Sequence, residues 1–231
     1  MADAPPSSPL PRLLLLLSAT TGLVDAASVL GLGKVFTANM TGNVVFLGFA
    51  AAGTPGFRWQ VYVVALVTFM CGALAAGRLA KHQSGRPLRN WLLFSAIIET
   101  VLLWLAAAVA YGARSDQLGD GRTFVIIALT AVAMGFRNAT IRQLKVPDLT
   151  TTVLTLTITG LAADSGIAGG GNPNWSRRVA AVLSIFVGAL VGAVLVSRSG
   201  LTAPLALAGL IVLGSTLAAA RHPATAVPVS V

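Results

Sequence analysis

Charged residues are scarce in this sequence. Only 10% of its 231 residues are Asp, Glu, Lys or Arg, while 55% are hydrophobic, and the mean hydropathy is +0.82. A soluble domain carries about 25% charged residues, because its surface must be hydrated. The longest hydrophilic stretch, around residues 114–122, is too short to fold alone. The shortage of charge therefore excludes a soluble globular domain of this size.

Cysteine and catalytic motifs are also lacking. Cys71 is the single cysteine, which excludes a disulfide framework and a cysteine metal site. The sequence has no Ser/His/Asp arrangement and no HExxH motif, and the glycine-rich residues 169–173 lack the lysine of a phosphate-binding loop. We therefore expect no enzyme, no cofactor and no metal.

Basic residues are present in excess, but they do not indicate a nucleic-acid partner. The 16 Lys and Arg residues against 7 Asp and Glu give a net charge of +9. These basic residues are scattered between apolar runs and form no clustered face with interleaved aromatics. The bias of Lys and Arg toward cytoplasmic loops of membrane proteins explains them.

Long apolar runs recur along the whole chain. The runs are residues 13–32, 61–79, 91–111, 124–136, 179–197 and 201–220. About 20 apolar residues in a helix cross the hydrocarbon core of a bilayer. We therefore predict one all-α integral membrane domain over residues 1–231, surrounded by lipid, with disordered tails at 1–11 and 222–231.

The two halves of the chain resemble each other. GLVDA at 22–26 parallels GFRNA at 135–139, TANMT at 37–41 parallels TTVLT at 151–155, and GAL at 72–74 parallels GAL at 188–190. The small-residue runs of the last match predict seams where helices pack closely. The matches keep their order, so we divide the chain into repeat halves at 12–114 and 121–221.

Each half contains a short polar segment, at 36–52 and 150–163. If both segments cross the membrane there are eight spans; if both are re-entrant there are six. Crossing segments place 9 Lys and Arg inside and 7 outside. Re-entrant segments with a cytoplasmic N-terminus place 11 inside and 5 outside, and that count includes Arg137 among the inside loops. The positive-inside rule favours the second scheme.

Six spans have a consequence for symmetry. Three spans in each half is an odd number, so the second half must be inverted relative to the first. Inverted repeats with broken helices at the membrane midplane are typical of secondary transporters. We therefore predict two inverted 3+3 repeats, two re-entrant or broken polar segments, and both termini in the cytoplasm.

The polar segments supply candidate residues for a solute pathway. The first segment reads FTANMTGN and carries Thr37, Asn39, Thr41 and Asn43. Amide and hydroxyl groups beside a broken backbone suit a polar or ionic solute that binds weakly. The second segment contributes Thr152 and Thr155. The alternative is that these groups only hold helices together.

Ionisable residues within the spans are further candidates. Asp25 lies in the first span, and its repeat counterpart is Asn138, next to Arg137. An intramembrane acid usually faces a cavity or carries protons, and an Asp25–Arg137 pair is one expectation. A structural pair that only joins the halves is the alternative. Glu99, in the middle of another span, is a candidate proton relay or ion ligand.

Three motifs resemble those of a known family. GLVDA at 22–26, VFTANMTGN at 35–43 and MGFRNA at 134–139 are similar to the hallmarks of the YoaK-like family of bacterial membrane proteins. The resemblance spans nearly the whole chain, and FTANMTGN is its most specific part. It implies a bacterial inner-membrane protein of about six spans, with no established substrate. The sequence departs from the family pattern at Arg137 and Leu156.

Two functions remain open from the sequence. The first is a secondary transporter or channel for a small polar or ionic solute, with proton coupling through Asp25 or Glu99 as one form. The second is a non-transporting assembly or regulatory protein, and either one can be a homo-oligomer. A membrane-depth cavity lined by Asn39, Asn43 and Thr155 would favour transport, whereas a dry interface would favour the alternative.

Overall fold

The computed structural model describes residues 8–83, 85–112, 118–144, 151–152 and 154–228. Six long helices dominate the described residues, and all six are long and apolar enough to cross a membrane. These helices are α1 (Leu10–Gly31), α3 (Trp59–Gln83), α4 (Leu88–Ala110), α5 (Asp120–Leu144), α7 (Trp175–Ser199) and α8 (Thr202–Ala220). The described residues form no β-strand beyond one isolated bridge. The predicted multi-pass all-α membrane fold is confirmed.

Two shorter helices precede α3 and α7. Helix α2 (Met40–Ala51) has 12 residues and α6 (Thr155–Ala163) has 9. At 1.5 Å per residue they are about 18 and 14 Å long, well short of a hydrocarbon core of about 30 Å. Neither can span alone, in agreement with the six-span scheme.

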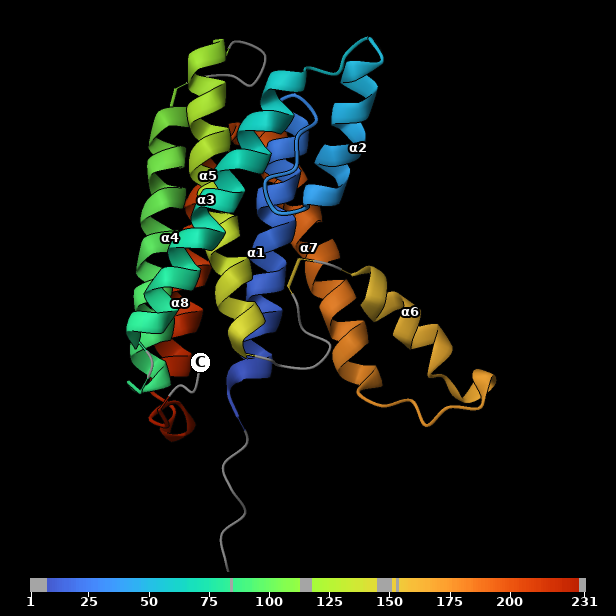
Figure 1. The fold of residues 1–231 in the computed structure, drawn as a ribbon, viewed down its shortest axis with the longest axis vertical. Helices are drawn as coiled ribbons and strands as arrows, with labels where there is room; N and C mark the ends of the chain where they lie inside the picture. Colours follow the sequence, from blue (N-terminus) through green and yellow to red (C-terminus); the bar gives the residue numbers. More distant parts are fainter. Residues whose placement is uncertain (1–7, 84, 113–117, 145–150, 153, 229–231) are drawn as a thin grey trace, which may run out of the picture.

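The long helices alternate in direction (Figure 1). Helices α1, α4 and α7 run one way, and α3, α5 and α8 run the other way. Each short helix begins near the middle of the bundle: α2 runs from there to the upper end of the view and α6 to the lower end (Figure 1). The chain therefore enters the bundle and turns back before α2, and α6 likewise begins at mid-height of the bundle (Figure 1).

Helix α5 is longer than its apolar run predicted. It continues beyond residue 136 to Leu144, and Arg137 lies within it at 2% exposure. Counting Arg137 with the cytoplasmic loops was therefore wrong, because a helix continues through a charged residue whose side chain finds buried partners. Removing it from the count leaves the charge bias in the same direction.

The predicted disorder of the tails is wrong where the structure describes them; residues 1–7 and 229–231 lie outside the described residues. Leu10 and Pro11 already belong to α1, since proline fits the first turn of a helix. At the other end, Pro223–Thr225 forms a 3-10 turn, and the N–H of Leu88 donates to the carbonyl of Val227 at 2.9 Å. The C-terminal segment is therefore fastened to the start of α4.

Close crossings at glycine join two pairs of long helices. Helix α1 packs against α7, and α5 packs against α3. A Cβ at Gly22 or Gly188 would strike the backbone of the facing helix at the first crossing, and one at Gly72 or Gly135 would do so at the second. All four glycines lie in motifs that match within the sequence, with Gly22 corresponding to Gly135 and Gly72 to Gly188. Small residues let membrane helices approach this closely.

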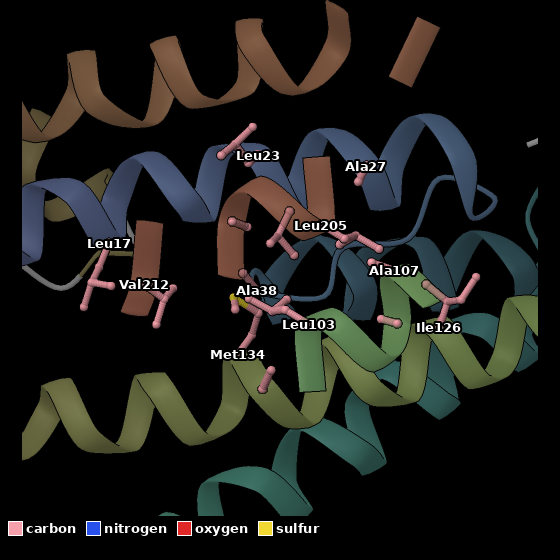
Figure 2. Packing of buried hydrophobic residues seen from close by; sticks show 14 of the residues in the cluster. Leu17, Leu23, Ala27, Ala38, Leu103, Ala107, Ile126, Met134, Leu205 and Val212 are labelled. Carbon is pink, nitrogen blue, oxygen red and sulfur yellow. The ribbon is translucent and has the colours of Figure 1, made fainter. Parts of the chain in front are cut away.

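The remaining contacts complete one bundle. Helix α4 packs on α8 and α5, and α8 also packs on α1. The indole N–H of Trp104 donates to the carbonyl of Ala206 at 3.2 Å, joining α4 to α8. Figure 2 shows Leu103, Met134 and Leu205 gathered with Ala38 of the segment before α2. The first polar segment thus penetrates into the core.

A substitution at one crossing tests this packing. Gly188→Ala places a methyl group against the backbone carbonyl of Ala19, and overpacking of this kind costs about 1–3 kcal/mol. We expect a clearly lower melting temperature for the purified protein in detergent. Gly214→Ala in α8 meets no atom within 4 Å and should melt at or slightly above the wild-type temperature. Equal melting of the two variants would contradict the close crossing.

Candidate functional site

The segment before α2 is unwound, and Asn43 holds it in place. The backbone N–H of Phe36 donates to Asn43 Oδ1 at 2.9 Å, and Asn43 Nδ2 donates to the carbonyl of Phe36 at 2.5 Å. Asn43 is fully buried. Its carboxamide therefore satisfies backbone groups that no helix partner satisfies at membrane depth.

The segment before α6 is held by a different pair. Thr152 Oγ1 donates to Asn138 Oδ1 at 2.5 Å, while Asn138 Nδ2 donates to the carbonyl of Met134 at 2.8 Å. Thr151 has a positive φ of 62°, which turns the chain sharply. Asn138 thus fastens the second polar segment to α5.

Each short helix is anchored to the long helix that follows it. Phe46 of α2 contacts the rings of Phe57 and Tyr62, with centroids 5.4 and 5.8 Å apart. On α6 the contact is polar: Arg178 Nη1 of α7 donates to Asp164 Oδ2 at 2.7 Å. The two anchors leave the N-terminal ends of both short helices facing the middle of the bundle (Figure 1).

A cavity of about 340 Å³ lies between these N-terminal ends. Its lining residues come from α1, the two polar segments, the starts of α2 and α6, and α7. They are Thr21, Asp25, Asn39, Thr41, Gly42, Thr152, Leu154, Thr155, Ile158 and Ile185. Thr41 and Thr155 are exposed and therefore lie at its rim. The two polar segments therefore border a half-open cavity and are not packed against each other.

Asp25 is the single ionisable side chain among the described lining residues. Its Oδ1 atom is buried and has no hydrogen-bond partner. The backbone amide of Ala38 and the guanidinium of Arg137 are the polar groups near it. One carboxylate oxygen of a side chain that lines the cavity therefore lacks a hydrogen-bond partner in the protein.

Arg137 pairs with Glu99 and not with Asp25. Its Nη2 donates to Glu99 Oε1, and its Nη1 donates to the carbonyl of Leu17 at 3.0 Å and to Thr21 Oγ1 at 3.1 Å. Glu99 and Arg137 are 3% and 2% exposed. The expected Asp25–Arg137 ion pair is wrong, because the side chain of Arg137 points toward α4 and an earlier turn of α1.

Thr21 lies between this ion pair and the cavity. It receives the hydrogen bond from Arg137 and also lines the 340 Å³ cavity. On the other side, Glu99 and Arg137 line a second cavity of about 20 Å³, which has room for about one water molecule. Polar groups therefore continue from the large cavity through Thr21 to the buried pair.

The structure places the predicted site residues in three groups. Asp25, Asn39, Thr41, Thr152 and Thr155 line the cavity. Asn43 and Asn138 instead support the unwound segments, and Thr37, in the segment before α2, is buried with its Oγ1 unpartnered. Glu99 and Arg137 form the ion pair.

Sequence reasoning missed several lining residues. Thr21 lies four residues before Asp25 on the same helix, so helical spacing would have placed both on one face. Leu154, Ile158 and Ile185 form an apolar part of the wall, for which the sequence gives no signal. Among the described residues, no group of three His, Cys, Asp or Glu side chains could hold a metal ion.

Comparisons with known proteins assign the chain to a family. The model of the family described as "Protein of unknown function (DUF1275)" matches residues 13–218. The chain is also 32% identical over 152 residues to the UPF0700 transmembrane protein YoaK of Bacillus subtilis (strain 168), covering 66% of this chain and 65% of that relative's length. No solved structure matches. The predicted YoaK-like resemblance is confirmed, and the chain belongs to the DUF1275 family of transmembrane proteins.

Proposed function

We propose that this protein is a secondary transporter for a small polar solute, which binds in the cavity between α2 and α6. The single observation that carries the proposal is the 340 Å³ cavity, lined by Asp25 and by hydroxyl and amide side chains, where two half-length helices begin. Broken helices that meet at a midplane site are the arrangement in which transporters bind solutes. The proposal includes no chemical conversion of the solute.

Alternating access requires two halves that can rock about the site. The helix pairing supports two inverted repeats, at 12–114 and 121–221, because α1 pairs with α7 of the other half and α5 pairs with α3. The glycines at these crossings also correspond: Gly22 and Gly188 lie at the α1–α7 crossing, and Gly135 and Gly72 lie at the α5–α3 crossing. The opposite directions of α1 and α5 (Figure 1) support inversion, so movement of one half against the other would open the cavity to each side in turn.

Asp25 is the better candidate for coupling to protons. Glu99 already has a buried guanidinium partner in Arg137, so its carboxylate is engaged within the protein. Asp25 lines the cavity and has one buried carboxylate oxygen without a hydrogen-bond partner. Uptake or release of a proton at Asp25 would change the charge of the cavity directly.

The second candidate is a non-transporting assembly or regulatory protein. The glycine crossings and the Glu99–Arg137 pair support it, because they show that many small and polar residues serve helix packing. The two candidates differ in what they require of the cavity. A transporter must pass solute through it, whereas an assembly protein needs no passage.

Efflux from proteoliposomes tests the proposal. Vesicles that contain the full-length protein are loaded with a bacterial small-metabolite extract, and the external medium is analysed by mass spectrometry with and without a pH gradient. We expect at least one solute to leave faster than from protein-free vesicles. If no solute leaves faster under either condition, the transport proposal is wrong and the assembly role is favoured.

The proposal places the protein in the bacterial inner membrane with both termini in the cytoplasm. Single cysteines are introduced at Gly56 and Asn172, both exposed, after replacement of the natural Cys71 by serine. We expect an impermeant thiol reagent added to whole cells to label position 56, and to label position 172 only after the cells are opened. Labelling of both positions from the same side would contradict the six-span topology.

A further inference from the structure

We infer that the solute is a small zwitterion, carrying one ammonium group and one carboxylate as an α-amino acid does. The inference rests on the proposed function, since it names the class of solute for the same cavity. It is carried by the opposite charge character of two walls: α1 presents a carboxylate, and the starts of α2 and α6 present free N–H groups.

The α1 wall would bind the cationic group. Asp25 lines the cavity, and its buried Oδ1 accepts no hydrogen bond. No Lys, Arg or His is present among the described lining residues. The nearest guanidinium, that of Arg137, is engaged by Glu99, Leu17 and Thr21. An ammonium group in the cavity therefore meets no competing cation of the protein for Asp25.

The opposite wall would bind the anionic group. The N-cap residues of α2 and α6 are Asn39 and Leu154, and neither side chain caps its helix with a hydrogen bond. Thr41, Gly42 and Thr155 belong to the first turns of these helices and line the cavity. The first-turn N–H groups have no partner within their own helix. Such helix ends bind carboxylates and phosphates.

The charges of the two walls are similar in size. An ionised Asp25 carries one negative charge, and each helix N-terminus behaves as about half a positive charge. A cationic solute would leave the helix ends unpaired, and an anionic solute would face Asp25. A zwitterion pairs with both walls and leaves the cavity neutral.

The size of the cavity limits the solute further. About 340 Å³ lies at the small end of the roughly 300–1,000 Å³ of ligand sites. Leu154, Ile158 and Ile185 supply an apolar surface in the same cavity. This combination fits a free amino acid with a modest side chain better than it fits a peptide or a nucleotide.

Chemical variants of the solute test the inference without any change to the protein. The purified full-length protein is titrated in detergent with each of the standard amino acids, and binding is followed by isothermal calorimetry. The amino acid that binds best is then compared with its methyl ester, which keeps only the cation, and with its N-acetyl derivative, which keeps only the anion. We expect each derivative to bind at least about tenfold more weakly, because each loses one charged hydrogen-bonded contact.

A protein variant provides the second arm. Asp25→Asn should weaken the best amino acid by at least about tenfold, whereas the N-acetyl derivative, which has no cationic group and is no longer repelled by Asp25, should bind as well as before or better. Asp120→Asn removes an exposed carboxylate outside the cavity and should bind as the wild type does. The inference is overturned if no amino acid binds, or if either derivative binds as well as its parent.

This result is separable from the test of transport. Efflux of a solute that carries a single charge would overturn the zwitterion and leave the transport function standing. Tight binding of an amino acid without its passage across vesicle membranes would support the zwitterion and overturn the transport function.

Discussion

Arg137→Gln is expected to lower the free energy of unfolding by about 3–5 kcal/mol, because it leaves the carboxylate of Glu99 buried without a counter-ion. Both side chains are almost fully buried, and Arg137 also holds Leu17 and Thr21 of α1. Chemical or thermal unfolding in detergent measures the change. The double variant Glu99→Gln with Arg137→Gln should recover most of the loss, since no uncompensated charge remains.

The matched control is Arg58→Gln. Arg58 pairs with Asp120 at 2.9 Å, but the two side chains are 47% and 68% exposed, and exposed pairs contribute about 0–1 kcal/mol. The free energy of unfolding of the Arg58→Gln variant should therefore hardly differ from that of the wild type. A stable Arg137→Gln protein, or a double variant no more stable than the single one, would show that the buried pair does not join α4 and α5.

Asp25→Asn is expected to abolish coupled transport while the fold survives. Asparagine has nearly the same shape as aspartate, but its side chain carries no charge and takes up no proton near neutral pH. Loss of one hydrogen bond to a charged group corresponds to about 10- to 100-fold weaker binding. Asp25 has no ion-pair partner to orphan, so we expect a melting temperature equal to or above that of the wild type. Solute flux in proteoliposomes, with and without a pH gradient, measures the first effect.

Stability and flux together decide the role of Asp25. Lost flux at normal stability assigns it to the solute or proton site. A protein that no longer folds would show that Asp25 is a structural residue, and normal flux with normal stability would remove it from the mechanism. Asp120→Asn serves as the control and should keep normal flux, because it lies outside the cavity.

The sequence predicts the spans and breaks of this fold well, because apolar length and local polarity determine both. The runs at 91–111 and 201–220 lie close to the bounds of α4 and α8. The polar segments at 36–52 and 150–163 contain α2 and α6, although residues 150 and 153 lie outside the described residues. The prediction of a disordered tail at 222–231 was wrong for the described residues, because their contacts with the start of α4 are long-range and leave no local signal in the sequence.

Side-chain partners could not be predicted in the same way. Repeat matching placed Arg137 beside the counterpart of Asp25, but successive residues of a helix point about 100° apart. Asn138 therefore meets Thr152 before α6, whereas Arg137 meets Glu99 on α4. Glu99 has no charged counterpart in the other half, so nothing in the sequence joined it to Arg137. Such pairing depends on helix rotation within the bundle.

Chemical blocking of the cavity tests the central claim most directly, namely that solute passes between α2 and α6. Thr155 lines the cavity, while its neighbour Leu156 is 78% exposed and does not line it. Single cysteines at these two positions, in a Cys71→Ser background, are modified with a small thiol reagent in proteoliposomes. Modification at Thr155→Cys should stop the efflux of the transported solute, and that solute should slow the labelling, whereas modification at Leu156→Cys should leave efflux unchanged. Undiminished efflux through a fully modified Thr155→Cys protein would contradict a solute path through this cavity.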